Sequence, residues 1–504
     1  MKQPEDNTTI VAKDDSTFDH IVKYTGLFGG VQGVTMLMNL IRNKIASVLL
    51  GPDGLALINI YNNASRLVTE STNFGISISA VKHVSELFDT GDMARIHEFS
   101  VTVRTWSLYV GLLGTFVALV LAPWFSLWTF ENYDYTATYM LIAPIVGMGS
   151  VIGGEMAILK GLKQLKNVAI ISVISAISML IISAPLYFIW HMQGIIWALL
   201  LCQFAVLCIH LRYSTRAIPW QTALSSKTTL RDGLPMLKLG IGYVLAGLFG
   251  QGAEYLIRVL ILHWGTQADV GLYYSGYVLT VTYASMVFVA FEADYFPRLS
   301  ATNGQIERQN QTVNKQIMVS ILLMAPFLSL FVMALPTLIP LLFSNKFTEA
   351  IPMAITATFY MFFKSALLAA AYLPLARGDS KMYMLTELFY DVIIAITIPL
   401  AFRQWGLVGT GWALSLAGLL DMLFIHIVYR YRYHYNIDRQ TLRIFALQFL
   451  LFSLTYLSTT LDNFWLRWTL GPLTAAISLT FSYRFLRRET TIIQQIKLKF
   501  KKRK

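Results

Sequence analysis

Cysteine is nearly absent from this chain of 504 residues, which contains only Cys202 and Cys208. Both lie in one apolar segment, which excludes a disulfide framework and a cysteine-based metal site. Charged residues are also scarce, at 13% of the chain, whereas 55% of the residues are hydrophobic. Apolar stretches long enough to cross a bilayer recur along the whole sequence. Together these features predict an all-α polytopic membrane protein.

The sequence also lacks the motifs of common enzymes. It has no HExxH zinc motif, no GxSxG nucleophile motif and no phosphate-binding loop, and its histidines are scattered. A chain without an ATP-binding motif is not a primary ATPase by itself. We therefore expect no catalytic residue, no metal site and no cofactor, with Na⁺ or H⁺ as the only candidate coupling ions.

Apolar runs separated by charged loops predict about 14 transmembrane helices. The polar first 18 residues have no apolar signal region, so we expect the first span itself to direct membrane insertion. The predicted spans cover residues 19–50, 53–87, 98–123, 137–159, 168–190, 194–212, 232–263, 269–298, 316–343, 350–376, 382–402, 406–429, 441–460 and 466–485.

The loop charges give an orientation. Most loop lysines and arginines fall on one side of this topology, and the positive-inside rule makes that side cytoplasmic. An even number of spans then places both termini in the cytoplasm. The net charge of +12 is spread over separate loops, which favours contact with anionic lipid headgroups and disfavours nucleic acid. The cytoplasmic cations are Lys160, Lys163, Lys166, Arg212, Arg216, Lys227, Arg231, Arg430, Arg432, Arg439, Arg443 and a basic run at 497–504.

An internal repeat indicates two lobes. Leu40, Ile41 and Arg42 precede a short turn, and the same tripeptide recurs about 216 residues later, an offset of six spans. Glycine-rich stretches accompany both copies and allow close helix packing. We therefore predict two pseudo-symmetric six-helix lobes followed by two C-terminal helices. The predicted parts are a cytoplasmic N-terminal segment (1–18), an N-lobe (19–212), a cytoplasmic linker (213–231), a C-lobe (232–429), a helix pair (430–486) and a basic cytoplasmic tail (487–504).

Four cationic residues lie inside apolar segments, where an uncompensated charge is costly, and they suggest a pathway for something anionic. The four are Arg42, Arg66, Arg258 and Lys364. Lys364 is too deep in its span for its side chain to reach either interface. Arg42 could partly reach the outer interface. Glu70 and Glu254 lie four residues from the other two arginines and could neutralise them on the same helix face.

Acidic residues inside the spans form a second set. Asp391 and Asp421 are the deepest, and either could carry a coupling proton or sodium ion or bond to a neighbouring helix. Glu292, Asp294 and Arg298, near the inner end of one span, could form a gating network or an ordinary interfacial cluster. Three acids near cytoplasmic ends are expected simply to reach water: Glu155, Glu387 and Asp294.

One stretch resembles a known family. Residues 49–87 read LLGPDGLALINIYNNASRLVTESTNFGISISAVKHVSEL, with a turn at 51–54 and a Phe-Gly-Ile-Ser motif at 74–77. This stretch follows a long, glycine-bearing first helix. The pattern is similar to the first-to-second-helix region of the O-antigen flippases, the Wzx-type polysaccharide exporters. They belong to the multidrug/oligosaccharidyl-lipid/polysaccharide (MOP) superfamily, with the MATE drug exporters and the lipid II flippases.

The resemblance implies a secondary transporter of the bacterial inner membrane rather than an enzyme. It would carry an undecaprenyl-pyrophosphate-linked oligosaccharide from the cytoplasmic to the periplasmic leaflet by alternating access, alongside other polysaccharide-assembly membrane proteins. The residue pattern supports an anionic substrate, because the charges of a pyrophosphate need arginine or lysine to offset their desolvation. A MATE drug exporter needs an acidic cavity residue instead, and residues 21–51 contain no Asp or Glu.

Two alternatives stay open. A lipid II-type flippase would use the same anionic lipid, with its last two spans forming a groove for the polyprenyl tail. A membrane-embedded glycan polymerase or ligase would also bind a lipid pyrophosphate, but such enzymes present a large outer loop with catalytic residues. The longest outer loop here, about residues 123–136, has no basic residue, which weighs against that reading. Sugar contacts are expected to come from scattered polar and aromatic residues such as Tyr61, Gln251 and Tyr360.

The predicted topology has a direct test. Cysteines introduced at Asp134 and Asn463 should react from outside with a membrane-impermeant thiol reagent, because both positions fall in periplasmic turns. Cysteines at Gln164 and Asn310 should stay unlabelled in intact cells. The opposite labelling pattern would overturn the orientation.

Overall fold

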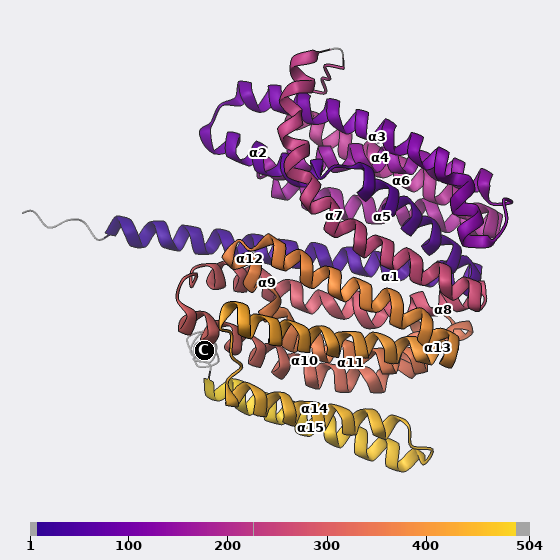
Figure 1. Cartoon of the computed structure of the whole chain (residues 1–504), viewed down its shortest axis with the longest axis vertical. Helices are drawn as coiled ribbons and strands as arrows, with labels where there is room; N and C mark the ends of the chain where they lie inside the picture. The colour runs from indigo at the N-terminus through magenta and orange to yellow at the C-terminus, as the bar shows by residue number, and fades with distance from the viewer. Residues whose placement is uncertain (1–7, 225, 490–504) are drawn as a thin grey trace, which may run out of the picture. The chain divides into compact units, whose positions relative to one another are not determined.

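The computed structural model describes the backbone of residues 8–224 and 226–489. The side chains of residues 8–29, of most of 227–246 and 286–294, and of residue 489 lie outside the description. Every regular element in the described residues is a helix, as the sequence predicts (Figure 1). The predicted cytoplasmic tail lies almost wholly outside the described residues, as does the first part of the predicted N-terminal segment.

The chain divides into two compact units, and two long helices belong to both. The first unit, the N-unit, contains Met1–Leu50 and Ala64–Leu248, and the second, the C-unit, contains Gly51–Asn63 and Phe249–Lys504. The shared helices are α1 (Thr8–Thr72) and α7 (Lys227–Trp264). The other helices of the N-unit are α2 (Ile76–Thr90), α3 (Met93–Phe130), α4 (Thr136–Gly161), α5 (Leu165–Trp190), η1 (His191–Gln193) and α6 (Gly194–Ala217).

The C-unit contains the remaining helices. They are α8 (Gln267–Tyr277), η2 (Val278–Tyr283), α9 (Ala284–Ser300), α10 (Ile306–Leu342), η3 (Asn345–Ala350), α11 (Ile351–Ala371), α12 (Leu373–Arg377), α13 (Ser380–Tyr433), α14 (Arg439–Thr459) and α15 (Phe464–Glu489). Helix α11 packs between α10 and α13, and α14 and α15 pair with each other against α10 (Figure 1). Buried hydrogen bonds join that pair, from the Gln448 amide to the Ser482 hydroxyl at 3.0 Å and between Thr455 and Thr474 at 2.8 Å.

Two glycines divide the longest helices. Gly51 in α1 and Gly406 in α13 have φ of 70° and 60°, a backbone conformation that other residues adopt at a cost. Both lie at turns that the sequence predicts between consecutive spans. A third break, at residues 73–75, divides the predicted span 53–87, because Gly75 has φ of 65° and α2 begins after it. The predicted span 269–298 contains a π-helical turn, η2, between α8 and α9.

Polar side chains in the loops set where several helices begin. The carboxylate of Asp92 accepts a hydrogen bond from the Arg95 amide at the start of α3. At the start of α13 the Asp379 carboxylate accepts from the Met382 amide at 3.2 Å, and at the start of α14 the Asp438 carboxylate accepts from the Thr441 amide at 2.6 Å. Such caps satisfy amides that have no partner inside the helix. They place the helix ends at the polar loops that separate the apolar runs.

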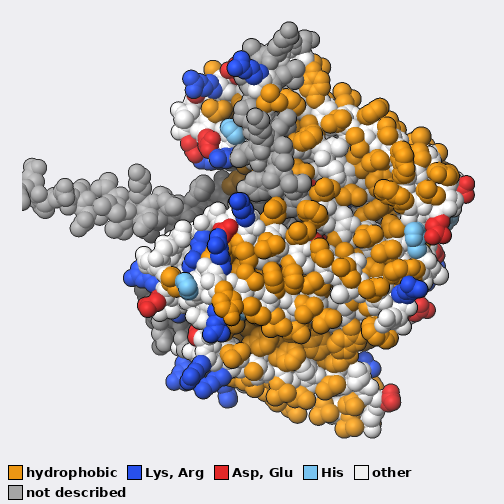
Figure 2. Space-filling model, viewed as in Figure 1, with side chains coloured by type: hydrophobic (Ala, Val, Ile, Leu, Met, Phe, Trp, Pro, Cys, Tyr) orange, Lys and Arg blue, Asp and Glu red, His pale blue; other side chains and the backbone are white. Residues whose placement is uncertain are grey.

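The helices are apolar enough to lie in lipid. Seven helical stretches in the described part of the chain have the length and hydropathy of membrane spans, and the protein is a multi-pass membrane protein. The full count of 14 spans stays a prediction. Figure 2 shows hydrophobic side chains over much of the visible helix surface. Such exposure would be unfavourable in water, but it matches the hydrocarbon of a bilayer.

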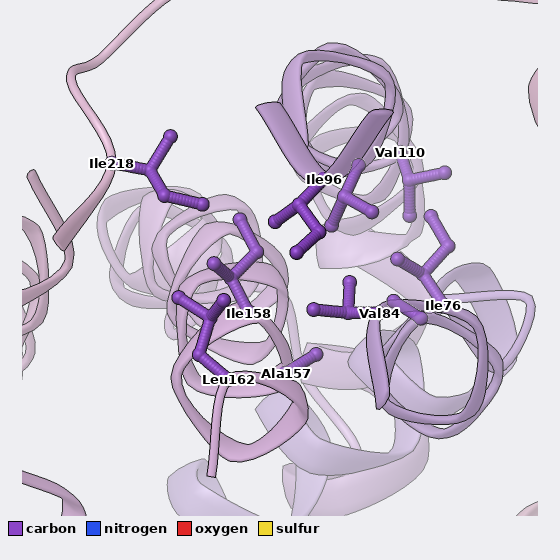
Figure 3. Close-up of a cluster of buried hydrophobic side chains, with 10 residues drawn as sticks. Ile76, Val84, Ile96, Val110, Ala157, Ile158, Leu162 and Ile218 are labelled. Carbon is purple, nitrogen blue, oxygen red and sulfur yellow. The ribbon is translucent and has the colours of Figure 1, made fainter. Parts of the chain in front are cut away.

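An apolar cluster holds together α2, α3 and α4 of the N-unit. The side chains of Ile76, Ile96 and Ile158 are fully buried and face one another across the three helices (Figure 3). Ile218, just after α6, completes the cluster, so the chain that leaves the N-unit helices is fixed to the same core. The position of this segment also depends on a buried charge.

That charge is Arg104 on α3, whose side chain is 1% exposed. Its guanidinium donates to the Glu155 carboxylate of α4 at 3.0 Å and to the carbonyl oxygens of Ile218 and Pro219 at 3.0 and 2.6 Å. It also lies 5.0 Å from the centre of the Trp220 ring. The expectation that Glu155 reaches water is therefore wrong, because this carboxylate is 1% exposed and paired with an arginine that the sequence analysis did not single out.

We expect Glu155→Gln to destabilise the protein by about 3–5 kcal/mol, because it leaves the Arg104 charge buried without a counter-charge. The measurement is the thermal unfolding midpoint of purified protein in detergent. Glu86→Gln is a matched control, since Glu86 pairs with Lys82 at an exposed site and should contribute less than about 1 kcal/mol. Equal shifts in the two variants would show that the buried pair has no special role.

Candidate functional site

The C-unit contains a cavity between α11 and α13 with a volume of about 280 Å³. Most of its polar lining comes from these two helices and combines one cation, two carboxylates and several tyrosines. The polar residues on its wall are Tyr360, Lys364, Tyr372, Tyr383, Thr386, Glu387, Tyr390 and Asp421. Lys364 was predicted to bind an anionic substrate and Asp421 to carry a coupling ion, and the structure brings both to this cavity.

Close packing of α11 on α13 fixes the cavity wall. The Ser415 hydroxyl of α13 donates to the Thr356 carbonyl at 2.7 Å and accepts from the Tyr360 amide at 3.2 Å. A Cβ atom at Gly418 would lie 2.7 Å from the Tyr360 ring, so only glycine fits there without movement of that ring. Tyr360 in turn stacks on Tyr390, with the ring centres 5.9 Å apart. The two helices therefore hold the tyrosines in place beside Lys364.

Lys364 is partly buried and lies one helical turn after Tyr360 on α11. Its ammonium lies 5.6 Å from the centre of the Tyr360 ring, in the range of a cation–π interaction. None of the described carboxylates lies within ion-pair distance of it, although Glu387 and Asp421 are close enough to interact with its charge. Lys364 is thus a cation whose ammonium can still take an anionic partner.

The two carboxylates on the cavity wall differ in exposure. Asp421 is 7% exposed, and its Oδ1 has no hydrogen-bond partner among the described residues. Glu387 is exposed and lines the cavity, where the sequence analysis expected it only to reach water at a helix end. Asp391 does not line the cavity. Its carboxylate lies against α7, 3.5 Å from where a Cβ atom of Gly250 would be.

Arg258 is compensated within the C-unit. Its side chain is 3% exposed, and its guanidinium forms an ion pair with the Glu254 carboxylate at 3.3 Å. It also donates to the Glu254 carbonyl at 2.5 Å and to the Asn59 side chain. Of the two possibilities that the sequence leaves for Arg258, the intrahelical pair with Glu254 is present in the structure. A further role in binding substrate stays a prediction.

Arg42 and Arg66 lie in the N-unit and carry no ion pair with any described carboxylate. Arg42 is partly exposed, and its guanidinium contacts the Met179 sulfur of α5 at 3.7 Å. Arg66 and Glu70 both have exposed side chains, and no ion pair joins them. Because the two units are described separately, a common site for these arginines and Lys364 stays a prediction.

Part of the predicted gating group lies outside the described residues. The side chains of Glu292 and Asp294 lie outside the described residues, whereas the Arg298 side chain is exposed. Among the described residues, no group of three His, Cys, Asp or Glu side chains is arranged to hold a metal ion.

Most of the aromatic wall of the cavity was not predicted from the sequence. Tyr383, Glu387 and Tyr390 follow one another at spacings of four and three residues, which places them on one face of a helix. Tyr360 and Lys364 have the same relation on α11. This spacing was a usable signal, because polar residues that share one face of an apolar helix usually face protein or a cavity rather than lipid.

The fold matches those of known transporters. An inward-facing multidrug resistance MATE family transporter of the MOP superfamily aligns with a TM-score of 0.68 and 13% identity, over 79% of this chain and 94% of that one. Lipid II flippase MurJ, in an inward closed conformation, aligns with a TM-score of 0.67 and 14% identity, over 91% of this chain and 99% of that one. A MOP superfamily transporter from Pyrococcus furiosus aligns with a TM-score of 0.57 and 13% identity, over 82% and 95% of the two chains.

The sequence comparisons give the family. No curated protein sequence matches this chain. The family model described as polysaccharide biosynthesis protein matches residues 49–352, more than half of the chain, beginning where the resemblance to the O-antigen flippases begins. That resemblance is confirmed for the family and for the fold. The chain belongs to the polysaccharide biosynthesis protein family and has the fold of the MOP superfamily transporters.

Proposed function

We propose that this protein is a flippase for a lipid-linked oligosaccharide in the bacterial inner membrane. It moves an undecaprenyl-pyrophosphate-linked glycan from the cytoplasmic to the periplasmic leaflet by alternating access, coupled to Na⁺ or H⁺, with both termini in the cytoplasm. The family match to polysaccharide biosynthesis proteins carries this proposal. The fold of a multi-pass transporter supports it, because the likeness to MurJ and MATE structures extends over most of the chain.

The cations of the apolar segments support an anionic substrate. Arg42, Arg66 and Lys364 have no carboxylate within ion-pair distance among the described residues, so each can still compensate a ligand charge. Arginine binds phosphate oxygens through two parallel N–H donors, and lysine supplies a point charge. In this proposal these three residues contact the pyrophosphate as it passes through the low-dielectric part of the protein. Arg258 contributes less directly, because Glu254 already balances its charge.

A lipid II-type flippase is the second candidate. The alignment with MurJ covers more of this chain than the MATE alignments do. Both candidates move a polyprenyl pyrophosphate, so the same cations would serve either one. The polysaccharide family match favours the oligosaccharide substrate. A flipping assay in liposomes with defined polyprenyl-pyrophosphate glycans would separate them.

We expect Lys364→Ala and Arg42→Ala, made separately, each to lower glycan export at least tenfold. Loss of a hydrogen bond to a charged group costs about 1.5–3 kcal/mol, which corresponds to this factor or more. The measurement is export of lipid-linked glycan in cells, normalised to the membrane abundance of each variant. Arg42→Lys should retain part of the activity, because it keeps the charge but loses the two-donor geometry.

The exposed residues Lys381 and Arg430 provide matched controls, and their alanine variants should export normally. Full export by both Lys364→Ala and Arg42→Ala would remove these cations from the proposed substrate path. Loss of membrane abundance in either variant would instead assign it a structural role.

Ion coupling is expected to depend on Asp391 or Asp421. A carboxylate in a poorly solvated site can bind a proton or, when ionised, a sodium ion. Replacing the functional one with asparagine should abolish gradient-driven accumulation in liposomes while downhill exchange of substrate stays measurable. Retained gradient-driven accumulation in both single variants and in the double variant would place coupling elsewhere. Glu307→Gln, a change in the first turn of α10, is a control that should leave coupling intact.

A further inference from the structure

The cavity between α11 and α13 carries opposite charges that are close but unpaired. Lys364, Glu387 and Asp421 all line it, yet the Lys364 ammonium lies over the Tyr360 ring rather than in an ion pair with a described carboxylate. Asp421 also lines the cavity and is more than nine-tenths buried, and its Oδ1 has no hydrogen-bond partner in the described part of the chain. Burying such an oxygen costs free energy unless something compensates it. The site therefore has a place for a positive charge.

The charges around the cavity leave an excess of negative charge. Its lining has one formal positive charge and two formal negative charges, because the tyrosines of the wall are neutral as phenols. Asp391, farther along α13, adds a negative charge within electrostatic range. Glu254 of α7 also faces this region, but its pairing with Arg258 balances it. Lys364 alone thus cannot neutralise the carboxylates.

We propose that Lys364 is a tethered counter-ion, whose ammonium competes with a mobile monovalent cation for the carboxylates of Glu387 and Asp421. The four-carbon stem of lysine lets the ammonium move between the Tyr360 ring and the carboxylates without movement of the backbone. In this structure the ammonium lies over the Tyr360 ring and forms no ion pair with either carboxylate, so both carboxylates can bind the mobile cation. Sodium, a hard cation, suits the oxygen ligands that this wall provides.

This competition has a consequence that rests on the proposed function. An anionic lipid that draws the Lys364 ammonium to its pyrophosphate leaves Glu387 and Asp421 without their internal counter-ion. The affinity of the carboxylates for the mobile cation then rises, and by linkage bound cation raises the affinity for the anion by the same factor. The cation is in this way a co-ligand of the anionic lipid at this site rather than its competitor.

The test is equilibrium binding of ²²Na⁺ to purified protein at alkaline pH, where protons compete least. Lys364→Gln should bind sodium at least about tenfold more tightly than the unmodified protein, because the competing charge is gone. Lys364→Arg, which keeps the charge, and Lys381→Gln, which removes an exposed lysine outside the cavity, should leave the affinity unchanged. Adding Asp421→Asn to Lys364→Gln should abolish the increase in sodium affinity. Lys364→Met replaces the glutamine variant if that variant does not elute as a folded protein.

An unchanged or weaker sodium affinity after removal of Lys364 would overturn the proposal, whatever the protein transports. A second arm repeats the binding with undecaprenyl pyrophosphate present, which should tighten sodium binding in the unmodified protein and not in Lys364→Gln. If sodium binding tightens on removal of Lys364 but does not respond to the lipid, the counter-ion role stands and the proposed contact with pyrophosphate fails. Displacement of sodium by the lipid would contradict the co-ligand relation.

Discussion

A charged side chain inside a membrane-spanning segment must be compensated, either by an opposite charge or by a polar cavity, because hydrocarbon offers neither. Two buried arginines of this protein are compensated by a carboxylate of the same unit. Arg104 and Glu155 form a fully buried ion pair, and Arg258 pairs with Glu254 one turn away on the same helix. Lys364 is instead placed beside a cavity. The kind of compensation separates charges that hold the fold from charges that can act on a ligand.

The buried pair of the N-unit shows what a compensated charge does. The Arg104 guanidinium uses its remaining donors on the carbonyl oxygens of Ile218 and Pro219, so it fixes the chain after α6 to α3 and α4. All three nitrogens of this guanidinium donate to protein groups, so it is engaged in holding the fold rather than in binding a substrate. Lys364 is the opposite case, because it contacts the face of an aromatic ring and forms no ion pair with a described carboxylate, and a ring contact is weaker than an ion pair in a low-dielectric site.

The fold could be predicted from the sequence because its signals are local. Apolar runs give the helices, and the turns at Gly51 and Gly406 lie where short polar breaks were expected. The partners of buried charges are predictable only when they are local too. Arg258 and Glu254 lie four residues apart, so their pairing was one of two stated possibilities. Arg104 and Glu155 lie 51 residues apart, in different predicted spans. The sequence pattern within one span does not indicate which residue of another span will pair with it. Glu155 was expected to reach water only because it lies near the cytoplasmic end of its predicted span.

Lys364 and Asp421 line the same cavity because small residues let their helices pack closely, not because of their charges. The two residues lie on α11 and α13, and these helices approach closely because glycine stands at position 418 and because Ser415 bonds to the α11 backbone. Neither feature is charged, and small residues in membrane helices are common packing surfaces. The charged residues of the cavity could therefore be identified from the sequence. That they line the same cavity could not be predicted, because it follows from the way the two helices pack.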